Sequence, residues 1–234
     1  MRLDKYLADC GVGTRSEIKK MIKRGEVSVD GASKVTPDLK LDEETAFVSV
    51  MGNHIKYRKY VYLMLNKPKD VISATYDKKL PTVAELIPPE YAHYELFPVG
   101  RLDIDTTGLL ILTNDGGLAH RLLSPSKHIP KTYIAKLDTP LSENDVKAFS
   151  ENMDLGDFVT KPAELVILDD FTAKVTISEG KFHQVKRMFE KTGKTVLDLK
   201  RIKMNRLCLD ESLDIGEVRE LNDYELELLT YGTK

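Results

Sequence analysis

The sequence predicts an α+β protein in which a small helical unit precedes a larger domain with a mainly antiparallel mixed sheet and flanking helices. Three observations support this. The first 50 residues hold two helical patterns followed by a short alternating segment. From residue 60 onward, strand-like segments dominate without regular helical crossovers. The 234 residues suit two unequal domains, which we expect at residues 1–50 and 60–234, with a polar linker at 51–59.

The elements of the first unit follow from periodicity and capping residues. A short helix with one apolar face is predicted over residues 3–9, and a second helix begins after Thr14. Thr14 and Glu17 have the spacing of a capping box. Val27–Val29 alternates as a strand, and Asp30-Gly31 suits the tight turn after it. The unit is therefore expected to have an α-α-β order.

The larger domain is expected to contain at least six strands and four helices. The strands come from short runs rich in β-branched and apolar residues, and the helices from runs with a period near 3.6. The predicted strands are Tyr60–Leu65, Leu109–Thr113, Thr132–Leu137, Ala163–Leu168, Ala173–Ile177 and Val196–Ile202. The predicted helices are Leu118–Leu123, Glu143–Glu151, Gln184–Lys191 and Asp223–Leu229.

Composition excludes several classes of protein. The chain has 35 Lys and Arg against 37 Asp and Glu, so it is not a uniformly basic nucleic-acid coat. It has no apolar run long enough for a membrane span and no signal-peptide core. Its two cysteines, Cys10 and Cys208, lie far apart and form no CxxC pair, which argues against a disulfide scaffold or a four-ligand zinc site. We therefore expect a cytoplasmic protein with reduced thiols and no membrane partner.

Positive charge is nevertheless concentrated in two segments. Residues 1–34 carry eight basic and five acidic residues. Residues 180–206 carry nine Lys and Arg against two acidic residues, and eight Asp and Glu in residues 207–234 offset them in the total. Local basic surfaces of this kind are typical of proteins that bind nucleic acid.

The first basic segment resembles an S4-type RNA-binding domain. The resemblance rests on Arg2–Leu7, Thr14-Arg15-Ser16 and Gly25–Gly31, in this order. It implies binding to structured RNA, mainly through phosphate contacts. A row of cations on one side of a helix can also serve only for solubility. The candidate RNA-binding residues are Arg2, Lys5, Arg15, Lys19, Lys20 and Lys23.

Residues 100–116 read GRLDIDTTGLLILTNDG, and their charged positions alternate with apolar ones. On an extended backbone the charged side chains would share a face. Thr106-Thr107-Gly108 is then expected to turn the chain into the buried run Leu109–Leu112. An acidic residue before such a turn is well placed at the edge of a cleft.

Two other interpretations of this segment remain open from spacing alone. Asp103 and Asp105 could be strand-edge charges paired with Arg101. The string Asp103–Thr107 also fits DxDxT, the signature of Mg-dependent phosphotransferases with an aspartate nucleophile. Those enzymes need a hydrophobic strand before the first aspartate, whereas here the hydrophobic strand follows it.

The longer Gly100–Gly116 string resembles the catalytic signature of pseudouridine synthases of the RsuA/RluB/E/F branch. Three further segments agree with it in order: Leu65–Pro68, Lys131-Thr132-Tyr133 and Glu179–Phe189. Together with the S4-like unit, the resemblance covers nearly the whole chain. It implies isomerisation of uridine to pseudouridine within RNA: the N1–C1′ bond breaks, the uracil rotates, and C5 bonds to C1′. No group enters or leaves, so no cofactor or metal is expected.

The resemblance also implies the site residues. Asp103 would be the essential acid, acting as a nucleophile or as a base, and Lys186 with Arg187 would keep it ionised. Tyr133 would stack on the target uracil, although a strand tyrosine is ordinarily a core residue. The candidate catalytic residues are thus Asp103, Tyr133, Lys186 and Arg187. The RNA-binding candidates near them are Arg101, Lys181, His183 and Gln184.

The string His183–Phe189, the segment Thr160–Ala163 and the lack of a basic C-terminal extension resemble the members that modify small-subunit 16S ribosomal RNA. We therefore expect a 16S enzyme, acting as a monomer on rRNA that is free or packed in an assembling small subunit. The alternatives are an enzyme of the 23S type and an inactive S4-domain assembly factor.

Overall fold

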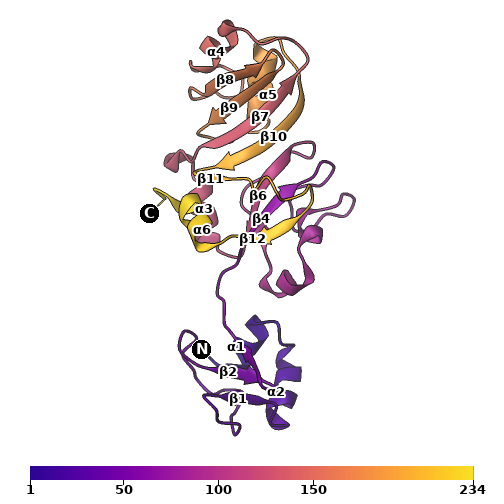
Figure 1. Cartoon of the computed structure of the whole chain (residues 1–234), viewed down its shortest axis with the longest axis vertical. Coiled ribbons are helices and arrows are strands. Elements are labelled where there is room, and N and C mark those ends of the chain that lie inside the picture. The colour runs from indigo at the N-terminus through magenta and orange to yellow at the C-terminus, as the bar shows by residue number, and fades with distance from the viewer. Residues whose placement is uncertain (234) are drawn as a thin grey trace. The chain divides into compact units, whose positions relative to one another are not determined.

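The computed structural model describes residues 1–233 and divides the chain into two compact units (Figure 1). The first comprises Met1–Val61 with Pro89–Glu95, and the second comprises Tyr62–Pro88 and the chain from Leu96 onward. Within the described residues, no helix has both the length and the apolar character needed to cross a membrane.

The first unit has two helices and a three-stranded antiparallel sheet. Its elements are α1 (Leu3–Asp9), α2 (Arg15–Lys23), β1 (Val27–Val29), β2 (Val48–Val50), β3 (Asn53–Ile55) and η2 (Pro89–Tyr94). The predicted capping box is confirmed, because Thr14 accepts from the Glu17 backbone and the Glu17 carboxylate accepts from Thr14. The expected linker is wrong at Asn53–Ile55, since the turn at Met51-Gly52 folds this segment back onto β2.

The second unit is built on a sheet that contains nine strands among the described residues. They are β4 (Tyr62–Lys67), β5 (Phe97–Pro98), β6 (Thr107–Thr113), β7 (Lys131–Leu137), β8 (Glu164–Asp169), β9 (Thr172–Ile177), β10 (Val196–Met204), β11 (Leu207–Cys208) and β12 (Val218–Glu220). The order is β12-β4-β6-β10-β7-β9-β8, with β11 on β10 and β5 on β6. All pairs of these strands are antiparallel except β6–β10, which confirms the predicted mixed sheet.

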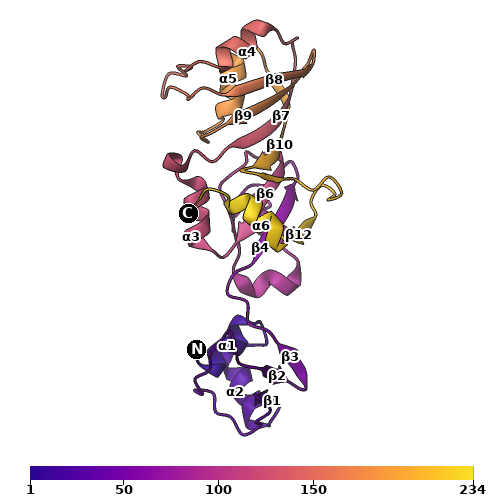
Figure 2. The same ribbon diagram turned by 60° about the vertical axis from the view of Figure 1, so that its left-hand side comes forward.

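Four α-helices and two short 3₁₀ helices accompany this sheet. They are η1 (Val83–Leu86), α3 (Gly116–Leu123), η3 (Pro125–Lys127), α4 (Glu143–Phe149), α5 (Gln184–Lys191) and α6 (Asp223–Thr230). In both ribbon views α4 and α5 lie beside the β7–β9 part of the sheet, and α3 and α6 lie beside the β4–β6 part (Figure 2). The six predicted strands and four predicted helices are all present, with ends shifted by at most two residues.

A close approach of two backbones joins the two parts of the sheet. β10 runs parallel to β6 over a two-residue register in which Arg201 lies opposite Gly108, and its other edge pairs antiparallel with β7 from Val196 to Met204. A Cβ atom on Gly108 would lie 2.2 Å from the Arg201 carbonyl oxygen, and Gly108 also has a φ of +99°. Both constraints require glycine at this position.

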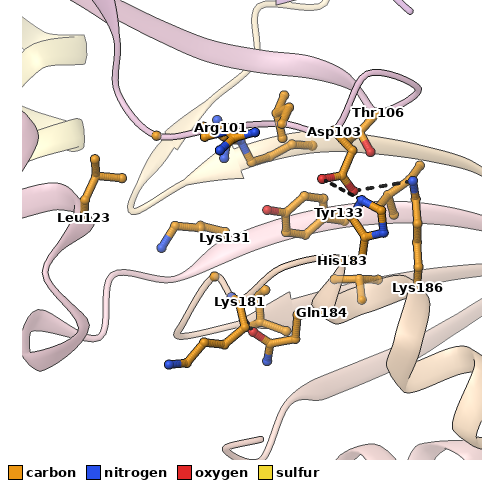
Figure 3. Close-up of a pocket in the computed structure, with 17 residues that line it drawn as sticks. Arg101, Asp103, Thr106, Leu123, Lys131, Tyr133, Lys181, His183, Gln184 and Lys186 are labelled. Carbon is orange, nitrogen blue, oxygen red and sulfur yellow. Dashed lines mark hydrogen bonds and ion pairs between the residues drawn. The ribbon is translucent and has the colours of Figure 1, made fainter. Parts of the chain in front are cut away.

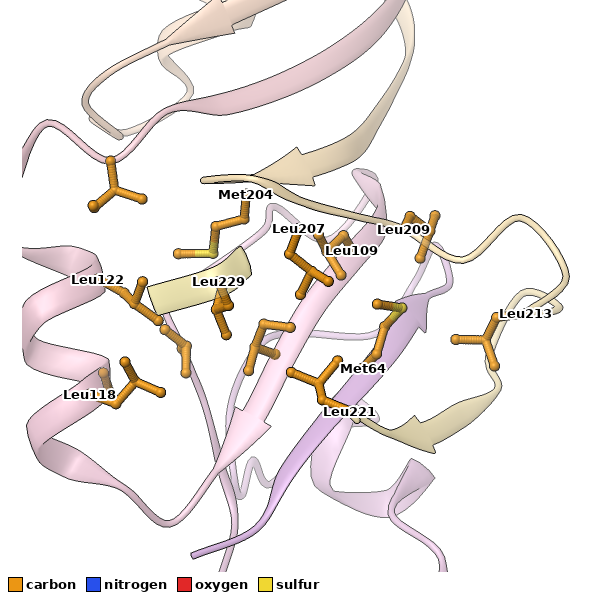
Figure 4. Packing of buried hydrophobic residues seen from close by; sticks show 14 residues of the cluster. Met64, Leu109, Leu118, Leu122, Met204, Leu207, Leu209, Leu213, Leu221 and Leu229 are labelled. Carbon is orange, nitrogen blue, oxygen red and sulfur yellow. The ribbon is translucent and has the colours of Figure 1, made fainter. Parts of the chain in front are cut away.

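The core beneath the β4–β6 part of the sheet is aliphatic (Figure 4). Met64 on β4, Leu109 on β6 and Met204 on β10 are fully buried. They pack against leucines from α3, α6, β11 and the segments that follow β11 and β12, namely Leu118, Leu122, Leu207, Leu209, Leu213, Leu221 and Leu229. This core holds the strands from which the pocket described below is built.

The central acidic segment is a loop and not the extended strand that alternation predicts. The Thr106 amide donates to the Asp103 carbonyl at 3.1 Å, so the chain turns at Asp103–Thr106. Thr107 and Gly108, which were expected in the turn, are already part of β6. The segment is not extended because its carbonyl oxygens accept hydrogen bonds from the Lys67 ammonium and not from a neighbouring strand.

Candidate active site

A cavity of about 300 Å³ opens beside β10, which lies between β6 and β7 in the sheet (Figure 3). The loop before β6, the strands β7 and β10, and the segment that leads into and begins α5 form most of its lining, and Leu123 of α3 and Ile177 of β9 complete it. Its polar and charged lining residues are Arg101, Asp103, Thr106, Lys131, Tyr133, Lys181, His183, Gln184, Lys186 and Arg201. The volume is at the lower end of the range for small-ligand pockets. It therefore suits one base or nucleotide and not a whole RNA strand.

The loop that carries Asp103 is held from beneath by Lys67 at the end of β4. The buried Lys67 ammonium donates to the carbonyl oxygens of Asp103 at 3.2 Å and of Thr106 at 3.0 Å. Burial lowers the pKa of Lys67 to about 8, against the opposing attraction of the nearby carboxylates of Asp105 and Asp103. Since an ammonium has three donors, one side chain can fix several carbonyls of a tight turn.

The Asp103 carboxylate lies between two basic groups from the α5 segment. Lys186 Nζ is 3.4 Å from Asp103 Oδ2, and His183 Nε2 is 3.6 Å from Asp103 Oδ1 (Figure 3). Lys186 also bonds Asp105 Oδ1 at 2.5 Å. Burial would raise the pKa of Asp105, but the hydrogen bond and the charge of Lys186 hold it below its usual value. The two aspartates therefore pair with Lys186, and not with Arg101 as the strand-edge interpretation proposed.

Tyr133 lies in the middle of the pocket. It stands on β7 with 7% of its surface exposed, and Figure 3 shows its ring between Lys131 and Asp103. Its cross-strand neighbour on β10 is Arg201. The ring thus combines the burial of a core tyrosine with a position on the cavity wall.

The structure does not bring Arg187 to this pocket, and this corrects its expected pairing with Asp103. Its guanidinium forms an ion pair with Asp157, donates to the Leu155 carbonyl at 2.7 Å, and lies 4.9 Å from the centre of the Phe158 ring. Successive helical residues point about 100° apart. Lys186 and Arg187 therefore cannot both face the aspartate.

The other residues predicted near the site line the pocket but differ in their contacts. Arg101 and Lys181 are exposed at its edge. His183 has a left-handed backbone, φ 50°, and its ring stacks on the exposed Phe182 at 3.8 Å. Gln184 is buried, accepts from the Lys181 amide at 3.1 Å and donates to Glu179 at 2.8 Å. Its side-chain contacts brace the segment that leads into α5.

The predicted RNA-binding cations of the first unit fall into two groups. Arg2 makes two hydrogen bonds to Asp4, and Lys5 forms an ion pair with Asp9, so their charges are offset within the unit. The other four lie exposed on α2, namely Arg15, Lys19, Lys20 and Lys23. The α2 row is therefore better suited to phosphate contacts.

Sequence reasoning assigned no role to Lys67, Lys131 or Arg201. A signal for Lys131 was present, because it lies two residues before Tyr133 and alternate strand residues share a face. Arg201 follows Leu199 on β10 in the same way, and both line the pocket. Among residues 1–233, no group of three or more His, Cys, Asp or Glu side chains is arranged to hold a metal ion.

Comparison with known proteins agrees with this geometry. Residues 61–191 match the model of the RNA pseudouridylate synthase family, and residues 1–45 match the S4 domain. The chain belongs to the RNA pseudouridylate synthase family. It is therefore an enzyme of the isomerase class with an N-terminal S4 domain, as the sequence predicted. Its aspartates precede the strand β6, which also disagrees with the phosphotransferase signature.

Similar proteins match over the full length of the chain. An uncharacterized RNA pseudouridine synthase of Bacillus subtilis is 47% identical over 98% of both chains. The ribosomal small subunit pseudouridine synthase A of Haemophilus influenzae is 40% identical, covering 98% of this chain and 99% of its own. A crystal structure described as pseudouridylate synthase is 38% identical, with a TM-score of 0.69 over 98% of this chain and 99% of that one.

Proposed function

We propose that this enzyme isomerises one uridine of small-subunit 16S ribosomal RNA to pseudouridine, with Asp103 as the essential carboxylate. The observation that carries the proposal is the ion pair of Asp103 with Lys186 in a pocket that Tyr133 also lines. The small-subunit substrate is supported by the name and full-length similarity of the Haemophilus influenzae relative.

The site geometry supports a direct role for Asp103. Lys186 Nζ lies 3.4 Å from the Asp103 carboxylate and places a positive charge beside it. An ionised carboxylate can attack C1′ of the ribose or remove the proton on C2′. In either case Asp103 needs the sugar beside it, and the 300 Å³ pocket allows only the target nucleotide to reach it.

The target base must leave its stack before it can reach the pocket. Unstacking costs a few kcal/mol, and aromatic side chains commonly receive the extruded base. We propose that Tyr133 stacks on the uracil. Exposed cations of α2 and those at the pocket edge, Arg101 and Lys181, would bind RNA phosphates and offset the cost.

The test is incubation of the purified protein with unmodified 16S RNA, 23S RNA and small-subunit particles, followed by pseudouridine mapping. We expect modification of one uridine in 16S RNA or in the particle, and the comparison of these two arms identifies the form of the substrate. Modification of 23S RNA alone would show that the enzyme is of the large-subunit type. Light scattering in the same buffer tests the expected monomer.

Asp103→Asn is the matched variant for this assay. It keeps the size of the side chain but removes the negative charge, so turnover should fall on the order of 10³-fold or more. RNA affinity should stay within about threefold, because Asp103 contributes no positive charge to phosphate binding. Retention of wild-type turnover by this variant would contradict the assignment of Asp103.

A further inference from the structure

Two buried cations line the pocket, and one of them, Lys131, lies on the far side of Tyr133 from Asp103 (Figure 3). Lys131 on β7 is 8% exposed and Arg201 on β10 is 2% exposed. Lys131 lies two residues before Tyr133 on the same strand face, and Arg201 is the cross-strand neighbour of Tyr133. The two cations and the aromatic ring therefore belong to one wall.

Neither cation is neutralised within the described part of the chain. Lys131 Nζ donates to the Ile129 carbonyl at 3.0 Å, and Arg201 Nε donates to the Leu109 carbonyl at 2.7 Å. Arg201 Nη2 is buried without a hydrogen-bond partner. Among the pocket-lining residues, the one carboxylate, that of Asp103, is paired with Lys186 instead.

An arrangement of this kind is unfavourable in the empty protein. Buried charges are normally paired, and an isolated one costs several kcal/mol. Burial, reinforced by the charge of Arg201, lowers the pKa of Lys131 to about 8. A negative group that enters the pocket would compensate the buried charges of both Lys131 and Arg201. The free donors of Arg201 Nη2 and Lys131 Nζ could bind such a group.

We infer that Lys131 and Arg201 bind the carbonyl edge of the target uracil and stabilise the negative charge that the base acquires when it detaches. This inference rests on the proposed function. When the N1–C1′ bond breaks, its electron pair leaves with N1. Resonance spreads the resulting charge over O2 and O4 of the ring.

The stabilisation does not depend on which role Asp103 takes. If its carboxylate attacks C1′, a C–O bond replaces the C–N bond and uracil leaves as an anion. If the carboxylate removes the C2′ proton, a C1′=C2′ double bond forms and the same anion leaves. Fixed donors aimed at a developing charge in a buried site give the largest catalytic benefit.

The burial of Lys131 and Arg201 favours a base over a backbone phosphate as the group they bind. A base is a terminal branch of the RNA and can reach buried groups, whereas a phosphodiester must connect outward on both sides. Figure 3 shows Tyr133 between Asp103 and Lys131. A uracil that stacks on this ring with its ribose at Asp103 therefore directs its far edge toward Lys131, and Arg201 lines the same pocket.

A binding experiment tests the site without turnover. The probes are uracil and 5-nitrouracil, a pyrimidine that is anionic near neutral pH and whose anion has its own absorption band. We expect the full-length protein to bind the 5-nitrouracil anion about tenfold or more tightly than uracil, since charge-assisted hydrogen bonds are the stronger ones. Lys131→Met and Arg201→Gln should remove that preference, and Lys131→Arg should retain most of it.

Lys136→Met is the matched control. Lys136 is exposed on the same strand and does not line the pocket, so the preference should persist in this variant. Equal affinity for the two probes, no detectable binding of 5-nitrouracil, or a preference that survives both Lys131→Met and Arg201→Gln would overturn the inference. Thermal unfolding of every variant verifies that loss of binding is not loss of fold.

A kinetic experiment separates this role from phosphate binding. In single turnover with saturating 16S RNA, Lys131→Met should slow pseudouridine formation on the order of 10²-fold. Its RNA dissociation constant should change less than about threefold. The opposite result, weaker binding with an unchanged rate, would identify a phosphate contact and overturn the inference. Failure of the wild-type protein to modify any rRNA would instead contradict the proposed function, whatever the probes show.

Discussion

The cations of α2 and the cations of the pocket have the same chemistry in opposite environments. Arg15, Lys19 and Lys23 on α2 are exposed, so water screens their charges at little cost. Lys131 and Arg201 are buried, and the part of the chain that the structure describes offers them no carboxylate. The first group can attract any phosphate, whereas the second is stabilised only by a negative group inside the pocket.

This difference separates binding from catalysis. Exposed cations contribute affinity that falls with salt and is independent of the chemical step. Buried cations contribute little to encounter but act strongly on charge that develops beside them. Substitutions in the two regions should therefore change different measurements, and the predictions below are ordered by the size of the expected effect.

The largest effect in the comparison should come from substitution of Lys186. Lys186→Met leaves Asp103 and Asp105 without their shared cation, and it removes the hydrogen bond and the charge that hold the pKa of Asp105 below its usual value. Turnover at neutral pH should fall at least about 10²-fold, because Asp103 loses the cation that lies against it. Initial rates at saturating RNA measure this.

Arg187→Met is the control for that prediction. Its guanidinium pairs with Asp157 outside the pocket, so turnover should stay within about twofold of wild type. Equal losses of turnover in the two variants would mean that charge in the α5 segment matters and the pairing with Asp103 does not.

The α2 cations should affect RNA affinity and its salt dependence. Arg15→Glu combined with Lys19→Glu should weaken RNA binding about tenfold near 0.1 M salt. It should also reduce the slope of log K against log salt by ~1.5, since each phosphate contact contributes about 0.7–0.9. Turnover at saturating RNA should be unchanged. Filter binding over a salt series provides the measurement.

The control reverses the same number of charges elsewhere. Lys136→Glu with Lys147→Glu changes two exposed lysines of the second unit that do not line the pocket. A similar loss of slope in this variant would show that α2 is not a special RNA surface and that only total charge matters.

The sequence predicted the exposed cations more successfully than the buried ones, for a physical reason. Periodicity identifies the outer face of α2, since the helix must bury Ile18 and Ile22. The resemblance to the synthase branch identified Asp103 and Lys186, which the structure brings together. The six predicted strands of the second unit could be recognised because each is a short run rich in β-branched and apolar residues.

The features that the sequence did not reveal depend on long-range contacts. Arg187 looks equivalent to Lys186 in the sequence, and its partner Asp157 lies 30 residues away. The role of Lys67 depends on hydrogen bonds to the loop of Asp103, 36 residues further along the chain, which its own neighbours in the sequence do not indicate. Strand β3 was missed because its pairing depends on the turn at Met51-Gly52 and on β2, and not on its own composition.

The last predicted effect concerns stability instead of binding or turnover, and it has the opposite sign from that of an ordinary core substitution. Lys131→Met replaces a buried, unpaired ammonium by an apolar side chain of similar length, at the cost of one hydrogen bond to Ile129. At pH 7 the variant should be as stable as wild type, or more stable by up to about 3 kcal/mol, the equivalent of lowering a pKa from 10.5 to about 8.

The difference in stability between Lys131→Met and the wild type should depend on pH. Between pH 8 and 10.5 the unfolded chain holds the Lys131 proton more strongly than the folded protein does, so wild-type stability rises with pH relative to the variant. The advantage of Lys131→Met should therefore shrink across this range, as urea unfolding at several pH values would show. A variant less stable than wild type at pH 7, with a gap independent of pH, would mean that Lys131 is an ordinary structural lysine. The contrast between exposed and buried cations would then rest on Arg201 alone.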